Sequence, residues 1–356
     1  MSALVVAAPT SARRLSKATL WATGAVSALV AFGVFGVLMA AGISEGFNIV
    51  AAVFVTAVLF VVLSYIMSRI VEGKRKASDR LATGLVTTAF IVALLPLISL
   101  VFTAVINGLP RFDAMFFSSS MRNIVGAGGG GLHAIIGTLE ITLAATIISV
   151  PIGIMTAIYL VEYGTGKLAK AITFFIDVMT GIPSIVAGLF AFALFAIFFG
   201  PGIRFGIGGA VALSILMIPV VVRSTEEMLK LVPNELREAS YALGVPKWLT
   251  IVKIVIPTAI GGIITGVMLS ISRIIGETAP LLIIVGMTTS MNYNLFEGRM
   301  ATLPVFVYTQ YASQGSDAQA YIDRAWTGAL VLILIVMALN LIARLVSKLL
   351  APKGLR

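Results

Sequence analysis

The sequence contains no cysteine, only one histidine and few charged residues, since Lys, Arg, Asp and Glu together make up 11% of its 356 residues. A soluble protein carries about twice this fraction of charge. Without cysteine there is no disulfide and no thiolate metal site, and His133 alone cannot form a histidine cluster. Hydrophobic residues instead make up 59% of the chain, in recurring runs of about 20 residues. The sequence therefore predicts an all-α polytopic membrane protein.

Eight apolar spans are predicted along the chain. The sixth is short, and the seventh is too long for one crossing at a rise of about 1.5 Å per residue, so we expect it to break near Gly276 or Pro280. The first two spans would form an N-terminal hairpin, residues 1–72, followed by a basic cytoplasmic linker, 73–80, and a six-helix region, 81–356. The eight spans are 18–42, 48–70, 81–106, 132–161, 170–199, 207–222, 251–290 and 327–349.

The basic residues are distributed unequally between the two sides of the predicted membrane. With the N-terminus in the cytoplasm, 19 of the 25 Lys and Arg residues fall on the cytoplasmic side, and Arg273 alone lies within a span. This asymmetry follows the positive-inside rule, so the net charge of +10 reports topology and does not require a nucleic-acid partner. We expect a bacterial plasma membrane protein with both termini cytoplasmic. The five outer arginines are Arg111, Arg122, Arg204, Arg299 and Arg324.

The glycine run "GAGGGG" at 126–131 is similar to a phosphate-binding loop only in composition. A P-loop requires Lys followed by Ser or Thr after its glycines, whereas Leu132 and His133 follow here. We predict a flexible extracytoplasmic loop, with His133 at the membrane interface and not a ligand.

The longest polar cytoplasmic stretch covers residues 223–250. Asn234 is a candidate N-cap for a short amphipathic helix, and Gly244 can adopt the left-handed conformation that ends it. Pro246 suits the first turn of a further helix. The stretch therefore predicts two short helices joined by a sharp turn on the cytoplasmic face.

The spacing of this stretch resembles the EAA loop of ABC-importer permeases. That motif has Glu-Ala-Ala, Gly after three residues, Ile after nine more, and Leu-Pro after one more; this sequence departs from it only at Ser240 and Ile256. The resemblance implies a type I ABC-importer permease core of six transmembrane helices. It also implies that the loop docks on a separate ATP-binding subunit through Arg237, Glu238, Ala239 and Gly244. The matching residues are Glu238-Ala239-Ser240, Gly244, Ile254 and Ile256-Pro257.

Four segments resemble the phosphate-specific permeases of the PstA type more closely. The hairpin 1–72 and Glu140 depart from that pattern, and we expect Glu140 to reach the outer interface, although it could also line the pathway. The resembling segments are "IGTLEITLAATIISVPIGIMTAIYLVEY" (136–163), "GIPSIVAGL" (181–189), "IPVVVRSTEEMLKLVPNELREASYALG" (218–244) and "SRIIGETAPLL" (272–282).

The resemblance implies a subunit without a catalytic or metal site of its own. ATP and Mg²⁺ would be used by the partner ATPase, and no cofactor or nucleic acid is expected on this chain. The implied partners are the lipid bilayer, a homologous permease of the PstC type, two copies of a PstB-type ATP-binding subunit and an extracytoplasmic phosphate-binding protein of the PstS type.

Two other functions compete with phosphate import. A permease for another oxyanion, such as sulfate or molybdate, would share the loop and the fold. An autonomous secondary transporter predicts an inverted internal repeat, which the sequence does not show, and leaves the spacing of 238–257 unexplained.

Arg273 and Glu277 lie in one of the most apolar regions. On a continuous helix they share one face with small residues, and such a stripe packs against another helix or lines a cavity. Arg273 and Glu277 could form a structural salt bridge, or Arg273 could bind a transported oxyanion through its planar fork. We predict a pathway role, with the salt bridge as the resting state, while Asp177 caps or pairs locally. The predicted pathway residues are Ser270, Arg273, Glu277 and Thr278.

Overall fold

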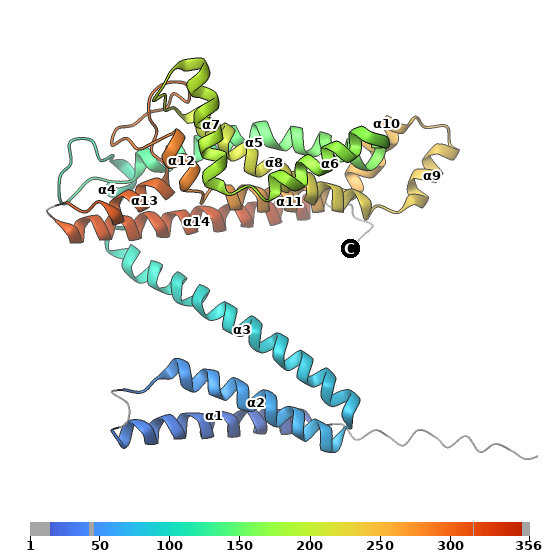
Figure 1. Ribbon diagram of the computed structural model, residues 1–356, viewed down its shortest axis with the longest axis vertical. Coiled ribbons are helices and arrows are strands. Elements are labelled where there is room, and N and C mark those ends of the chain that lie inside the picture. The colour runs from blue at the N-terminus through green and yellow to red at the C-terminus, as the bar shows by residue number, and fades with distance from the viewer. Residues whose placement is uncertain (1–14, 43–45, 316, 351–356) are drawn as a thin grey trace, which may run out of the picture. The chain divides into compact units, whose positions relative to one another are not determined.

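The computed structural model describes residues 15–42, 46–315 and 317–350, and every regular element in those residues is a helix (Figure 1). The chain divides into two compact units, Met1–Phe102 and Thr103–Arg356. Seven helical stretches in the described residues are long and apolar enough to cross a membrane, and a bent helix pair would add an eighth. The prediction of an all-α polytopic protein is confirmed.

The N-terminal unit consists of α1 (Lys17–Ala40), α2 (Ile49–Val71) and most of α3 (Lys74–Gly108). Ser16 and Asn48 cap α1 and α2 by accepting hydrogen bonds from amides in their first turns. Residues 74–80, predicted as a linker, are instead the first turns of α3. The turn at Gly73 (φ +89°) separates them from α2, and Lys, Arg and Ala favour helix.

Glu72 lies at the end of α2 and connects three parts of this unit. Its carboxylate accepts hydrogen bonds from the Leu15 amide (2.8 Å), the Ser68 hydroxyl (2.8 Å) and the Arg80 guanidinium (2.6 and 2.9 Å). The Arg80 guanidinium lowers the pKa of Glu72 to about 2. Because this pKa is depressed, the contact contributes stability above the carboxyl's ordinary pKa and loses it only as the pH falls toward about 2.

The C-terminal unit packs its helices around α8 (Gly206–Lys230). Ile141 of α5 and Leu213 of α8 lie in its largest apolar cluster, together with Ile274 and Ile284 from the last third of the chain. The other elements, in order, are η1 (Leu109–Arg111), α4 (Ala114–Ser118), α5 (Leu132–Ile158), η2 (Tyr159–Tyr163), α6 (Gly166–Thr180), α7 (Ser184–Phe199), α9 (Asn234–Ala242), α10 (Lys247–Thr250), η3 (Ile251–Val255), α11 (Ile256–Ile274), α12 (Ala279–Ile284), α13 (Leu303–Ala312) and α14 (Ala318–Leu350).

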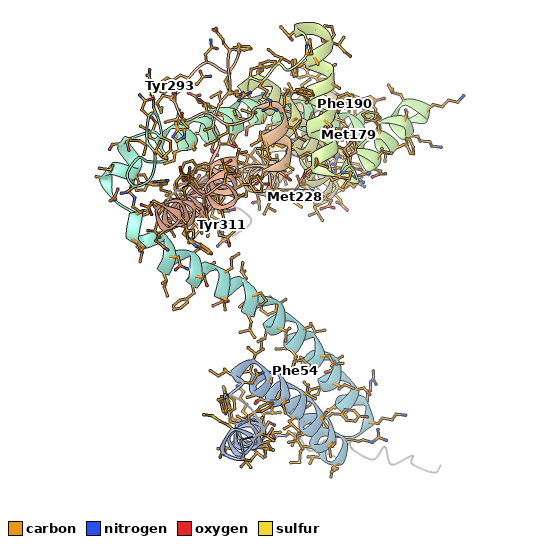
Figure 2. All side chains as sticks on the ribbon, turned by 60° about the vertical axis from the view of Figure 1, so that its left-hand side comes forward. Phe54, Met179, Phe190, Met228, Tyr293 and Tyr311 are labelled. Carbon is orange, nitrogen blue, oxygen red and sulfur yellow. The ribbon has the colours of Figure 1, made fainter. Side chains whose placement is uncertain are left out.

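Small residues permit the close approach of α11 to α8. A Cβ on Gly262 would lie 2.1 Å from the sulfur of Met228, which Figure 2 labels, and a Cβ on Gly266 would lie 2.4 Å from the hydroxyl of Ser224. The predicted stripe on α11 therefore packs against another helix, as small residues do between membrane helices.

Three of the predicted spans can be compared in detail with the structure: two differ from it and one is confirmed. The fifth is not straight, because α6 and α7 meet at 110° across the break at Gly181–Pro183, where proline removes an amide donor and disfavours helix before it. The sixth is not short, because α8 continues to Lys230. The predicted break in the seventh is confirmed, since α11 ends at Ile274 and α12 begins at Ala279.

The glycine run at 126–131 is held by contacts, which contradicts the predicted flexible loop. Arg324, buried in α14, donates to the carbonyls of Gly126 (2.6 Å) and Gly128 (3.0 Å), and Arg111 donates to that of Gly129 (2.6 Å). A Cβ on Gly130 would lie 2.5 Å from the Phe116 carbonyl. The His133 side chain is buried, and its ring packs edge-on against that of Phe306.

Candidate transport pathway and coupling surface

The α9–α10 turn has the geometry that its sequence predicts. Gly244 has a left-handed backbone conformation (φ +77°). Its amide donates to the Tyr241 carbonyl (2.9 Å), and the Val245 amide donates to the Ser240 carbonyl (3.2 Å). These bonds satisfy the last carbonyls of α9. Asn234 is the first helical residue and not the N-cap, because the preceding Pro233 already has the extended backbone of a cap.

Arg237 fixes α9 to the rest of the unit. Its guanidinium donates to the Glu162 carboxylate (2.8 and 3.0 Å) and to the carbonyls of Leu229 (3.0 Å) and Val232 (2.7 Å). Both side chains of the ion pair are largely buried, at 12% and 5% exposure. Arg237 therefore positions α9 from within the chain. Sequence reasoning did not identify Glu162, which is 75 residues away and has no motif of its own.

Two further contacts fix the turn. The hydroxyls of Ser240 and Thr250 hydrogen-bond across α9 and α10 (2.7 Å) and are both buried. Lys247 donates to the Glu162 carbonyl and lies over the Tyr163 ring, 4.9 Å from its centroid. Ser240, a departure from the motif, thus has a structural role here.

The face of α9 and the turn that points away from the rest of the unit is exposed and partly apolar. Glu238 and Ala239 are exposed on α9. Large apolar side chains are exposed around them: Leu236, Tyr241, Leu243 and Trp248. We call these six residues the coupling surface. A rigid turn that carries exposed apolar and acidic groups is suited to docking on another protein.

Arg273 and Glu277 do not form the predicted salt bridge in this structure; neither has an ion pair within the described residues. Because α11 ends at Ile274, Glu277 lies beyond the helix and does not share a face with Arg273. Arg273 is exposed on the single chain, and Glu277 is half-buried in the break before α12.

The other two predicted pathway residues lie in different surroundings. Ser270 is fully buried and donates to the Gly266 carbonyl (2.9 Å), so within this chain it contributes to helix packing. Thr278 is half-buried at the break, and its carbonyl accepts from the Leu282 amide (2.9 Å). The structure therefore groups Arg273, Glu277 and Thr278 at the helix break and separates Ser270 from them.

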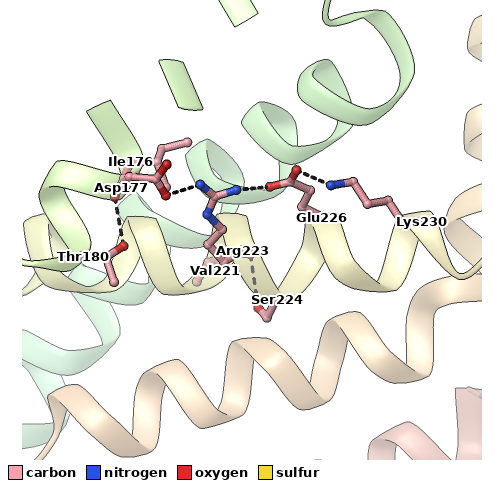
Figure 3. Close-up of polar contacts among 8 residues, drawn as sticks. All are labelled: Ile176, Asp177, Thr180, Val221, Arg223, Ser224, Glu226 and Lys230. Carbon is pink, nitrogen blue, oxygen red and sulfur yellow. Dashed lines mark hydrogen bonds and ion pairs between the residues drawn. The ribbon is translucent and has the colours of Figure 1, made fainter. Parts of the chain in front are cut away.

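An ion-pair network links α6 to the C-terminal part of α8 (Figure 3). Arg223 binds Asp177 of α6 and Glu226 (2.8 Å), and Lys230 also binds Glu226 (2.6 Å). Asp177 was predicted to cap or pair locally, but its partner Arg223 is 46 residues away on another helix, so the local part of that prediction is wrong. The spacing of Arg223, Glu226 and Lys230 on one helix face was the available sequence signal.

Glu140 lies on α5 with one carboxylate oxygen, Oε2, buried and without a hydrogen-bond partner in the described part of the chain. A side chain that reaches the outer interface would expose both oxygens, so the arrangement opposes that prediction. An acid in this position is costly unless it has a function or an external partner.

Comparisons with known proteins place this geometry in a class. Residues 149–355 match the family described as "Binding-protein-dependent transport system inner membrane component". This range covers the coupling surface, the helix break and most of the packed core of the C-terminal unit. The chain is thus an inner membrane component of that kind.

Curated relatives narrow the class. The chain is 46% identical to the phosphate transport system permease protein PstA 1 of Mycobacterium tuberculosis (strain CDC 1551 / Oshkosh) over 276 residues, 77% of this chain and 90% of that protein. It is 46% identical to PstA of Mycobacterium leprae (strain TN) over 281 residues, 78% and 90% of the two chains. It is 42% identical to PstA of Pasteurella multocida (strain Pm70) over 276 residues, 76% and 95%. The chain belongs to the PstA family, and the predicted resemblance is confirmed.

Proposed function

We propose that this chain is one of two permease subunits of an ATP-driven phosphate importer and forms half of its transmembrane pathway. The observation that carries the proposal is the extended similarity to proteins named phosphate transport system permeases, over about three quarters of the chain. A permease for sulfate or molybdate would share the class but not these relatives.

The coupling surface supports an interaction with an ATP-binding subunit. Arg237 and the Ser240–Thr250 bond hold the α9–α10 turn rigidly, so a movement of the ATPase would be transmitted to α8 and α11. The proposed assembly contains a PstC-type permease, two PstB-type ATPase subunits, which use ATP and Mg²⁺, and a PstS-type binding protein outside.

The helix break supports the pathway. Arg273 lies in the last turn of α11 as an exposed guanidinium without an ion pair in the described residues, and a planar guanidinium suits the paired oxygens of phosphate. Its exposure on the single chain is what a half-pathway requires before the second permease covers it.

Reconstitution of the complete complex in liposomes tests the function. With loaded binding protein outside and ATP inside, radiolabelled phosphate should accumulate. Accumulation of sulfate or molybdate in place of phosphate would identify another oxyanion importer. Phosphate accumulation without ATPase subunits would identify a secondary transporter.

The proposed orientation, in which both termini are cytoplasmic, has a separate test. Single cysteines can be introduced and labelled because the chain has no native cysteine. A cysteine at Ser119, between α4 and α5, should react with an impermeant thiol reagent from outside. One at the exposed Ser78, at the start of α3, should react only after permeabilisation. Outside labelling of Ser78 in intact cells would reverse the orientation.

A further inference from the structure

Two arginines far apart in sequence converge on one glycine of the C-terminal unit. Relative to the position that a Cβ on Gly286 would occupy, Arg204 Nη1 lies 3.2 Å away and Arg299 Cδ lies 3.4 Å away. Arg204 precedes α8, and Arg299 lies in the loop between α12 and α13. Arg204 is half-buried and Arg299 is exposed, so the pair is reachable from solvent.

The backbone around the two arginines is fixed by hydrogen bonds. The amides next to Arg204 donate to the opposite segment, Phe205 to the Ile284 carbonyl (3.3 Å) and Ile207 to the Leu295 carbonyl (2.7 Å). The Arg299 carbonyl accepts from the Asn292 side chain (3.0 Å). Gly286 is left-handed (φ +75°), a conformation that a larger residue would strain. The two arginine side chains are thus held beside the same glycine by a defined loop.

The positive charges of the pair are not compensated within the described residues. Neither guanidinium has an ion pair or a hydrogen bond there, and Glu297, two residues from Arg299, is exposed and also has no ion pair. Two neighbouring like charges disfavour each other. An oxyanion between them would remove this repulsion and accept charge-assisted hydrogen bonds from both.

The short helix α12 connects this pair to the helix break. Near its start, Pro280 packs on Gly188 of α7. At its end, Ile284 and Val285 pack on Gly208 and Gly209, in the first turn of α8. Six helical residues span about 9 Å. Gly286, beside which the two arginines lie, is therefore separated by the length of α12, about two helical turns, from Glu277 and the break that follows Arg273.

We propose that Arg204 and Arg299 form an outer receiving site for a phosphate-like inorganic oxyanion, which then passes along α12 toward Arg273. The proposal rests on the proposed function, and it adds a first binding step at the extracytoplasmic end of the pathway. Charges of one sign at the mouth of a pathway raise the local concentration of the opposite ion and its capture rate.

Uptake by the complete complex tests the site. The Arg204→Gln/Arg299→Gln variant should take up phosphate about tenfold more slowly than wild type at low ionic strength. The difference should shrink at high ionic strength, because salt screens exposed charges. Arg204→Lys/Arg299→Lys should restore most of the rate. Arg122→Gln, which removes an exposed outer arginine elsewhere, is the matched control and should change nothing.

A direct readout uses a cysteine at Thr289, an exposed residue three positions after Gly286. In the purified complex without binding protein, a negatively charged thiol reagent should react with it faster than a neutral one. Inorganic phosphate, compared with chloride at equal ionic strength, should slow the charged reagent only. The double Gln variant should lose both effects.

Three results separate the possible failures. If wild type transports phosphate and the double Gln variant matches it, the receiving site is wrong and the proposed function stands. If the double Gln variant loses uptake only because loaded binding protein docks more weakly in a direct titration, the arginines are docking contacts and the receiving site is again wrong. If wild type transports no phosphate, the proposed function itself fails.

Discussion

Helices α1 and α8 are equally apolar by mean hydropathy, yet their surroundings within the chain differ. In the most apolar 18 residues of each, 17% of α1 and 67% of α8 are buried. Glycine positions in the two helices illustrate the difference. A Cβ on Gly33 or Gly36 of α1 would meet no atom within 4 Å, whereas one on Gly209 of α8 would lie 2.3 Å from Val285. Hydropathy predicts that a helix enters the membrane, and close contact at small residues decides which helix it packs against.

The largest expected effect comes from a glycine that faces backbone. A Cβ on Gly137 of α5 would lie 2.2 Å from the Ala301 carbonyl oxygen, which cannot move aside as a flexible side chain can. Gly137→Val should cost about 3 kcal/mol or more through overpacking and sharply reduce the yield of assembled complex. Gly36→Val makes the same change in α1 and should leave the yield unchanged. Equal yields in size-exclusion profiles of the two variants would remove the contrast between the units.

Arg273 should have the next largest effect, on transport rather than assembly. Arg273→Gln should abolish phosphate uptake, and Arg273→Lys, which keeps the charge but loses the fork, should reduce it roughly tenfold. Since Arg273 and Glu277 form no ion pair here, Glu277→Gln alone should leave the complex yield intact. The double variant Arg273→Gln/Glu277→Gln should assemble and remain inactive. Uptake regained in this double variant would mean that the two residues form a purely structural pair.

The coupling surface should show an intermediate effect. Gly244→Val meets no atom within 4 Å but forces a β-branched residue to φ +77°, a strain of about 1–3 kcal/mol. It should reduce phosphate-stimulated ATP hydrolysis by the complex, and Gly244→Asn, which tolerates this conformation, should reduce it much less. Glu238→Lys should weaken co-purification of the ATPase. Normal hydrolysis and normal co-purification in these variants would refute docking through this surface.

Local patterns in the sequence predicted some features and missed others for identifiable reasons. Gly244 and the break near Gly276 follow from local backbone chemistry, so they were predicted correctly. The bend at Gly181–Pro183 was missed because apolar composition continues through it. The prediction of an Arg273–Glu277 salt bridge was wrong because it assumed that helical spacing continues past the end of α11.

Long-range contacts could not be predicted from local patterns. Arg237 and Glu162 are 75 residues apart, and Arg324 reaches carbonyls 196 and 198 residues away. Arg204 and Arg299 converge only because two loops meet beside Gly286. Nothing in the spacing of these residues along the chain encodes the meeting, since it results from how α8 and α12 pack.

The smallest effect is expected from removing residues 1–72. The family match begins at residue 149, and the helix break and the coupling surface both lie beyond it. The close glycine contacts of α8 and α11 also lie in the C-terminal unit. Deletion removes Glu72 and leaves Arg80 without its partner, but an arginine at a helix end can reach water at little cost.

The shortened chain, 73–356, should therefore assemble with somewhat lower yield and transport phosphate at close to the wild-type rate per complex. Arg80→Gln in the shortened chain is the control for the unpaired charge. Assembled complex without uptake in both variants would show that the N-terminal hairpin takes part in transport.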